Sequence, residues 1–65
     1  MDLMRKEFLE MIDVNQVLEF NEVWSNVERH GLVMEVIFTA LEEMRQNPNS
    51  SPLLCLQIAA KDWDC

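Results

Sequence analysis

The sequence has few of the residues from which small proteins build cross-links. It contains two cysteines and one histidine in 65 residues. Two thiols cannot form the dense disulfide framework of a secreted mini-protein, so we expect Cys55 to be a buried free thiol and Cys65 an exposed one, with an intermolecular Cys65 bridge as the exception. A closed zinc site needs four ligands, mostly Cys and His. The sequence therefore predicts neither a structural metal nor a cofactor.

Basic residues and long apolar runs are scarce as well. Five Lys and Arg stand against 12 Asp and Glu, which gives a net charge of −7. Binding to nucleic-acid backbones or anionic membrane surfaces needs clustered cations, so the charge argues against both kinds of partner. The longest apolar run has only three or four residues, far short of the ~20 that span a bilayer. Without a signal-peptide pattern at the start, we expect a cytoplasmic protein.

Glycine and proline, which commonly mark the ends of helices, occur at few positions in the chain. Gly31 is the only glycine, and Pro48 and Pro52 are the only prolines. They divide the chain into three blocks, and none shows the strict period-two alternation of strands. The sequence predicts one all-α domain over residues 1–65, a compact bundle of three to four short helices. The expected helices cover about 2–12, 14–29, 32–46 and 52–63.

Capping residues define most of these boundaries. Ser51 is a favoured N-cap, and Pro52 then occupies the first helical position, where its missing N–H costs nothing. Arg29 and His30 suit the negative end of a helix dipole, and Gly31 can adopt the left-handed conformation that ends a helix. Two helices joined by one glycine should meet at a corner.

The first 30 residues allow two interpretations. Asp2 can cap a helix whose apolar positions Met4 and Phe8 recur at helical spacing. Asp13 followed by Gln16 resembles a capping box, which predicts a break between two helices. A single long bent helix is the alternative.

The helix expected at 32–46 has two adjoining apolar faces. The first, the expected core face, contains Val33, Val36, Ile37, Ala40 and Met44. The second contains Met34, Phe38 and Leu41. The narrow polar strip contains Glu35, Thr39, Glu42, Glu43 and Gln46. An ordinary surface helix has an apolar stripe only a little wider than ~100°, so this helix is either central to the fold or shared between two copies.

The helix expected at 52–63 also has more apolar residues than one core face needs. Its expected core face contains Leu53, Leu56, Ala59, Ala60 and Trp63. Leu54 and Ile58 lie nearly opposite that face. A 65-residue chain buries only about 60% of its unfolded surface, and small domains often gain stability by oligomerising. We therefore expect a homodimer or larger assembly, with Met34, Phe38, Leu41, Leu54 and Ile58 as the candidate interface. Alternatively, the first helix covers these residues within one chain.

No constellation of reactive residues points to catalysis. His30 stands alone, and we interpret it as a helix C-terminal residue; the carboxylates are expected to be solvated. Trp24 and Trp63 are expected in the core, and the five methionines are expected to fill gaps there. The sequence thus favours a non-enzymatic protein–protein interaction module. The alternative is an acidic inhibitor or adaptor that docks on a basic host protein or a nucleic-acid-binding protein.

The run GLVMEVIFTALEEMRQNPNSSPLLCLQIAAKDW, residues 31–63, resembles small uncharacterised all-helical proteins carried by tailed phages, including phages of marine bacteria. The residues that carry the resemblance are Gly31, Leu32, Glu35, Val36, Ala40, Leu41, Met44, Arg45, Pro48, Ala59 and Trp63. The resemblance implies a phage or environmental origin. It implies no activity and no functional residues.

Overall fold

The fold is a four-helix arrangement without strands in the part of the chain that the structure describes. The computed structural model describes the backbone of residues 2–65 and the side chains of residues 5–65. The helices are α1 (Asp2–Glu10), α2 (Val17–Arg29), α3 (Val33–Gln46) and α4 (Pro52–Asp62), with a 3₁₀ turn, η1 (Val14–Gln16), before α2. The predicted all-α bundle of short helices is confirmed, and each helix end lies within a few residues of the expected position.

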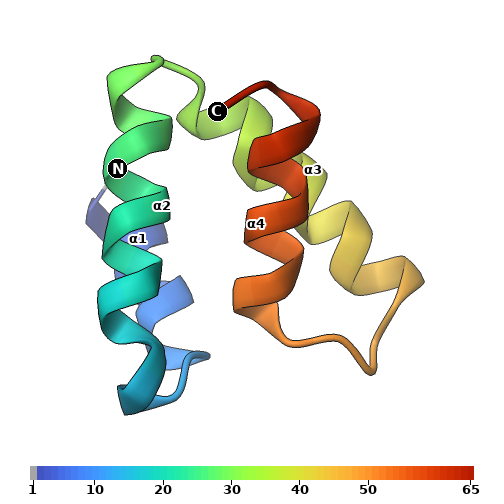
Figure 1. Cartoon of the computed structure of the whole chain (residues 1–65). Coiled ribbons are helices and arrows are strands. Elements are labelled where there is room, and N and C mark those ends of the chain that lie inside the picture. The colour runs from blue at the N-terminus through green and yellow to red at the C-terminus, as the bar shows by residue number, and fades with distance from the viewer. Residues whose placement is uncertain (1) are drawn as a thin grey trace.

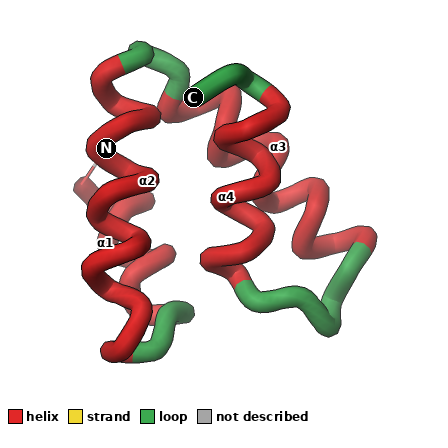
Figure 2. Tube along the Cα trace, viewed as in Figure 1, coloured by secondary structure: helices red, strands yellow, loops and turns green. Residues whose placement is uncertain are grey.

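The helices form two layers. In Figure 1, α2 and α4 lie in front and run in the same direction, while α1 lies behind α2 and α3 lies behind α4. The loops in Figure 2 show that α3 and α4 are joined by a longer connection than α2 and α3. The molecule measures 28 × 24 × 18 Å along its principal axes.

The corner between α2 and α3 is a Schellman motif. Gly31 has φ of +69°, in the left-handed region. The N–H of Leu32 donates to the carbonyl of Val27 at 3.2 Å, and the N–H of Gly31 donates to that of Glu28 at 3.0 Å. These two bonds satisfy carbonyls that the helix end leaves unpaired. The predicted glycine corner is confirmed.

The start of α4 also follows its sequence signal. The Ser51 hydroxyl accepts a hydrogen bond from the Leu54 N–H at 3.1 Å, and Pro52 occupies the first turn. The side chain thus satisfies one of the N–H groups that have no partner within the helix.

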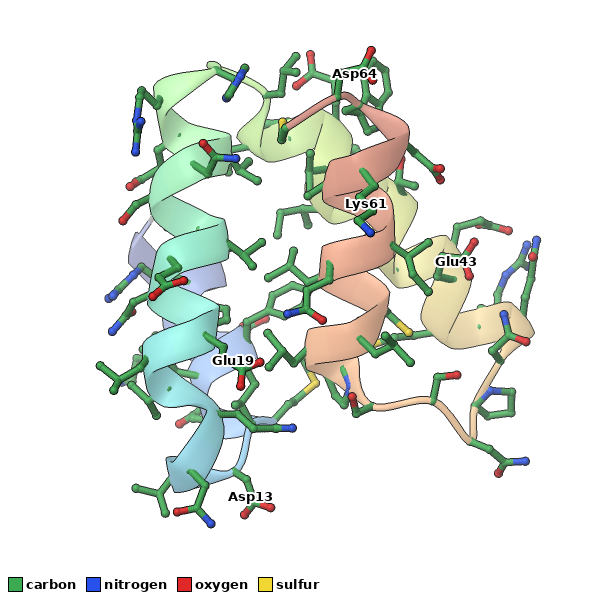
Figure 3. The ribbon with its side chains drawn as sticks, viewed as in Figure 1. Asp13, Glu19, Glu43, Lys61 and Asp64 are labelled. Carbon is green, nitrogen blue, oxygen red and sulfur yellow. The ribbon has the colours of Figure 1, made fainter. Side chains whose placement is uncertain are left out.

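The break after α1 exists, but the predicted capping box does not. Asp13 makes no side-chain cap bond; instead the backbone N–H of Gln16 donates to the Asp13 carbonyl at 2.9 Å. The segment is a 3₁₀ turn (labelled at Asp13 in Figure 3), and i→i+3 backbone bonds replace the reciprocal side-chain bonds of a box. The prediction of two helices is confirmed over the single long one. The side chains of Asp2, Met1 and Met4 lie outside the described residues.

An aromatic cluster joins α1 to α2 at the centre of the core. The ring centroids of Phe20 and Trp24 are 5.5 Å apart, and that of Phe8 is 6.4 Å from Phe20 and 6.3 Å from Trp24. The remaining buried apolar residues are Val27, Val36, Ile37, Ala40, Leu53, Cys55, Leu56, Ala59 and Ala60. Val33 and Met44 pack against this core. The first apolar face of α3 is therefore the core face, as predicted.

The end of α4 corrects two expectations. Trp63 is 41% exposed instead of belonging to the core, and Cys65 is half-buried against the core instead of exposed. The cause is a second Schellman motif: Asp64 has φ of +58°, and the Cys65 N–H donates to the Ala60 carbonyl at 2.8 Å. This reversal (Asp64 in Figure 3) directs Cys65 inward. Trp63 lies outside, where its Nε1 donates to Thr39 Oγ1 at 2.8 Å.

Candidate interaction surfaces

The five residues of the predicted interface are all exposed, but they do not form one patch. Phe38 is the most exposed of them, at 63%; Met34, Leu41, Leu54 and Ile58 retain between 36% and 47%. Leu41 lines a small depression with residues of α1, whereas Leu54 and Ile58 line a groove with residues of α2. The candidates thus lie on two separate surfaces. Whether either is an interface stays a prediction.

The first is the α3 surface, formed by Met34, Phe38 and Leu41 with Met11 at its edge. Leu41 and Met11 meet at the depression between α1 and α3, whose volume is about 80 Å³. Thr39 lies on the other side of α3, toward α4, because its Oγ1 accepts a hydrogen bond from Trp63 Nε1. At about 100° per residue, Phe38 therefore faces away from α4.

The described part of α1 reaches the α3 surface only at its Leu41 edge. It packs on α2, through Phe8 and through a hydrogen bond from Arg5 Nη2 to Asn21 Oδ1 at 2.6 Å. Met34 and Phe38 remain exposed beside it. Met11 and Met34 are exposed as well, so the expectation that methionines fill the core is wrong for these two; Met44 does pack there. The described side chains of α1, from residue 5 onward, therefore do not bury Met34 or Phe38.

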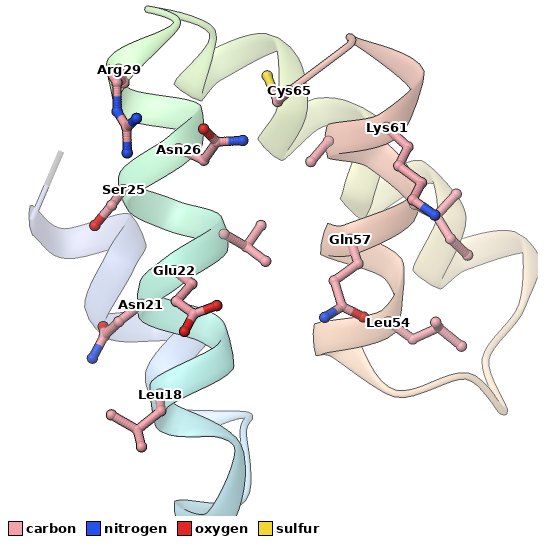
Figure 4. Close-up of a pocket in the computed structure, with 13 residues that line it drawn as sticks. Leu18, Asn21, Glu22, Ser25, Asn26, Arg29, Leu54, Gln57, Lys61 and Cys65 are labelled. Carbon is pink, nitrogen blue, oxygen red and sulfur yellow. The ribbon is translucent and has the colours of Figure 1, made fainter.

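The second surface is the α2/α4 groove, an open hollow of about 900 Å³ between those helices (Figure 4). Leu54 and Ile58 lie on its α4 side, and Leu18, 79% exposed, lies on its α2 side. Val23 and Ala60 belong to its apolar lining. Sequence reasoning missed Leu18. Helical spacing could have identified it, because Leu18 is an apolar residue that does not fall on the buried Phe20–Trp24–Val27 face of α2.

Two basic side chains mark one end of the groove. Arg29 and Lys61 stand in the last turns of α2 and α4, whereas Glu22 lies near the middle of α2. Figure 4 shows Arg29 near one end and Leu18 near the other. Within residues 5–65 the sole ion pair joins Arg45 to Glu42 on α3. The two cations of the groove therefore have no carboxylate partner among those residues.

His30 and Cys55 are the side chains whose surroundings bear most directly on reactivity. His30 is exposed, and its Nδ1 lies 2.8 Å from the Asn26 carbonyl oxygen at the end of α2. No three His, Cys, Asp or Glu side chains of the described residues are grouped as metal ligands would be. Burial raises the pKa of the Cys55 thiol, and the Glu43 carboxylate adds to the shift. A buried, protonated thiol is a poor nucleophile.

Comparison with known proteins adds no relative. No family model matches the chain, and no match was found among curated proteins or solved structures. None of the helices described within residues 2–65 has the length and apolar character needed to cross a membrane.

Proposed function

We propose that this protein is a small, non-enzymatic, cytoplasmic assembly module that associates with further copies of itself to form a homodimer or larger oligomer. The exposure of the α3 surface is the observation that carries the proposal. Phe38 projects from the middle of this surface with 63% of its area exposed, between Met34 and Leu41. Removing one such side chain from water contributes about 1.5–3 kcal/mol. The resemblance to small phage proteins supports a phage or environmental origin for such a module.

A second copy is the partner that best fits the size of the chain. A 65-residue domain is marginally stable, and binding of the folded state to itself stabilises it by mass action. Among the described residues no disulfide stabilises the folded state, since Cys55 and Cys65 are both free thiols. Self-association supplies the missing burial without a further component.

The proposal is tested by sedimentation velocity on the wild type and on Phe38→Glu. We expect the wild type to sediment at tens of micromolar as a species larger than the 7.7 kDa chain, and Phe38→Glu to be monomeric because a carboxylate would be desolvated at the interface. Asn49→Asp is the matched control: it adds the same charge to an exposed position in the loop between α3 and α4, outside the α3 surface, and should associate as the wild type does. A wild type that stays monomeric would refute the proposal.

The net charge of −7 supports a second candidate, an acidic inhibitor or adaptor that docks on a basic protein. The two functions respond to salt in opposite ways. Attraction between an acidic module and a basic partner weakens as salt screens the charges. Association between copies that each carry −7 strengthens with salt, because screening lowers the repulsion between them.

A further inference from the structure

We propose that copies associate head to tail, with the α3 surface of one copy filling the α2/α4 groove of the next. This inference rests on the proposed self-association and specifies its geometry. It assigns a distinct role to each of the two surfaces on which the exposed apolar residues lie.

The shapes of the two surfaces are complementary. The α3 surface is the exposed face of a single helix with a small depression at its Leu41 edge, whereas the groove lies between two helices and is concave. Met34, Phe38 and Leu41 follow the i, i+4, i+7 spacing with which a helix anchors in an apolar groove. The groove offers Leu18 on one side and Ile58 on the other.

The lengths of the helices also match. At 1.5 Å per residue, the 14 residues of α3 span about 21 Å and the 13 residues of α2 span about 20 Å. A docked α3 would therefore extend along the whole groove and place Phe38, near its centre, against the middle of the apolar lining.

The charges select the direction of docking. Helices α2 and α4 run in the same direction (Figure 1), so Arg29 and Lys61 in their last turns lie toward the same end of the groove. Helix α3 has Glu35 in its first turn and Arg45 in its last. Antiparallel docking brings Glu35, which has no cation partner among residues 5–65, toward the end of the groove that carries Arg29 and Lys61. The dipole of the docked helix then opposes those of α2 and α4, which is the favourable arrangement.

A two-fold pairing of α3 with α3 is less favourable electrostatically. In such an isologous contact each patch meets its own copy. The edge of α3 next to Phe38 carries Glu35 and Glu42, and Glu42 is already paired with Arg45. Antiparallel pairing would therefore bring together the Glu35 carboxylates of both copies in a seam where α3 has no unpaired cation. Like charges opposed across an interface disfavour it. The groove presents cations to the same edge instead.

Head-to-tail contacts do not close on two copies. The α3 surface faces away from α4, whereas the groove lies between α4 and α2. A copy that docks its α3 surface on a neighbour therefore keeps its own groove open for a third copy. We expect the mean mass to keep rising with concentration beyond that of a dimer.

The test is a complementation experiment with two variants, each blocked on one surface. Phe38→Glu blocks the α3 surface, and Ile58→Glu blocks the groove; both side chains are exposed, and far-UV circular dichroism confirms that each variant is folded. Sedimentation velocity at tens of micromolar should show each variant alone as a monomer. An equimolar mixture should form a 1:1 dimer and nothing larger, because the intact α3 surface of Ile58→Glu meets the intact groove of Phe38→Glu.

Other outcomes overturn the head-to-tail geometry. If Ile58→Glu alone dimerises, copies pair through α3 about a two-fold axis; if Phe38→Glu alone dimerises, they pair through the groove side. A mixture that stays monomeric while the wild type associates also rejects the geometry but leaves self-association intact. A monomeric wild type refutes the proposed function itself.

A charge exchange tests the docking direction separately. As a single substitution in the otherwise wild-type chain, Lys61→Glu should raise the dissociation constant for self-association at least tenfold. In the complementation mixture, placing Lys61→Glu on the copy with the intact groove and Glu35→Lys on the copy with the intact α3 surface should restore the 1:1 dimer. Failure of the pair to restore it would reject the antiparallel direction.

Discussion

Cys55 is the residue whose chemistry the fold changes most. Its side chain is fully buried in the core, and this burial, together with the Glu43 carboxylate, raises the pKa of its thiol above the ordinary value of 9.0. The folded protein therefore holds the proton at pH values where the unfolded chain releases it. The stability that depends on the protonated Cys55 thiol is fully present below pH 9.0 and is lost as the pH rises above that value.

The two thiols should consequently differ in reactivity. We expect iodoacetamide at pH 8 to alkylate the half-buried Cys65 at least tenfold faster than Cys55 in the folded protein, because only exposed thiolate reacts. In urea, which unfolds the chain, the two rates should become similar. Mass spectrometry of the alkylated peptides measures both rates. Equal rates in the native protein would show that Cys55 is not in the core.

Trp63 and Cys65 show where residue-level prediction fails. The helical spacing of the last block places Trp63 on the core stripe, and the terminal position of Cys65 suggests exposure. The turn at Asp64 reverses both expectations, because it ends the helix at Asp62 and folds Cys65 back toward the core, which leaves Trp63 exposed. Nothing in the spacing signals this turn, because Asp64 is not the glycine that usually marks a left-handed residue.

The elements themselves were largely predictable because short-range chemistry defines their ends. The Ser51 cap and the Gly31 corner both act through hydrogen bonds between residues at most five positions apart. The predicted capping box at Asp13 was wrong, although it too rests on local residues. The same residues can form a 3₁₀ turn, and here the Gln16 N–H bonds to the Asp13 backbone carbonyl rather than to its side chain.

The α2–α3 corner gives a stability test at this scale. Gly31→Ala should lower the free energy of unfolding by about 1 kcal/mol, because φ of +69° is strained for a residue with a Cβ. The added Cβ meets no atom within 4 Å, so any loss reflects backbone strain alone.

Gly31→Asn is the matched variant for this test. Asparagine tolerates the left-handed conformation better than alanine, so it should lose less stability. Urea denaturation measures all three proteins. Equal stability of Gly31→Ala and the wild type would contradict the left-handed corner.

At the scale of the whole molecule, the sequence indicated an excess of apolar surface but not its distribution. Helical periodicity identifies the second faces of α3 and α4 from local spacing alone. It does not show that Phe38 and Ile58 lie on different surfaces, because that depends on how α1 and α2 pack against them. Leu18 was missed for the same reason: its exposure becomes meaningful only once α4 stands across the groove.

The most direct test of self-association is the mass of the wild type in solution. Sedimentation equilibrium from 1 to ~200 μM, in ~0.1 M and ~0.5 M NaCl, measures it as salt shortens the Debye length from about 10 Å to about 5 Å. We expect a weight-average mass that rises with concentration above 7.7 kDa and rises more steeply at the higher salt. A mass that stays at 7.7 kDa over the whole range in both salts would contradict it.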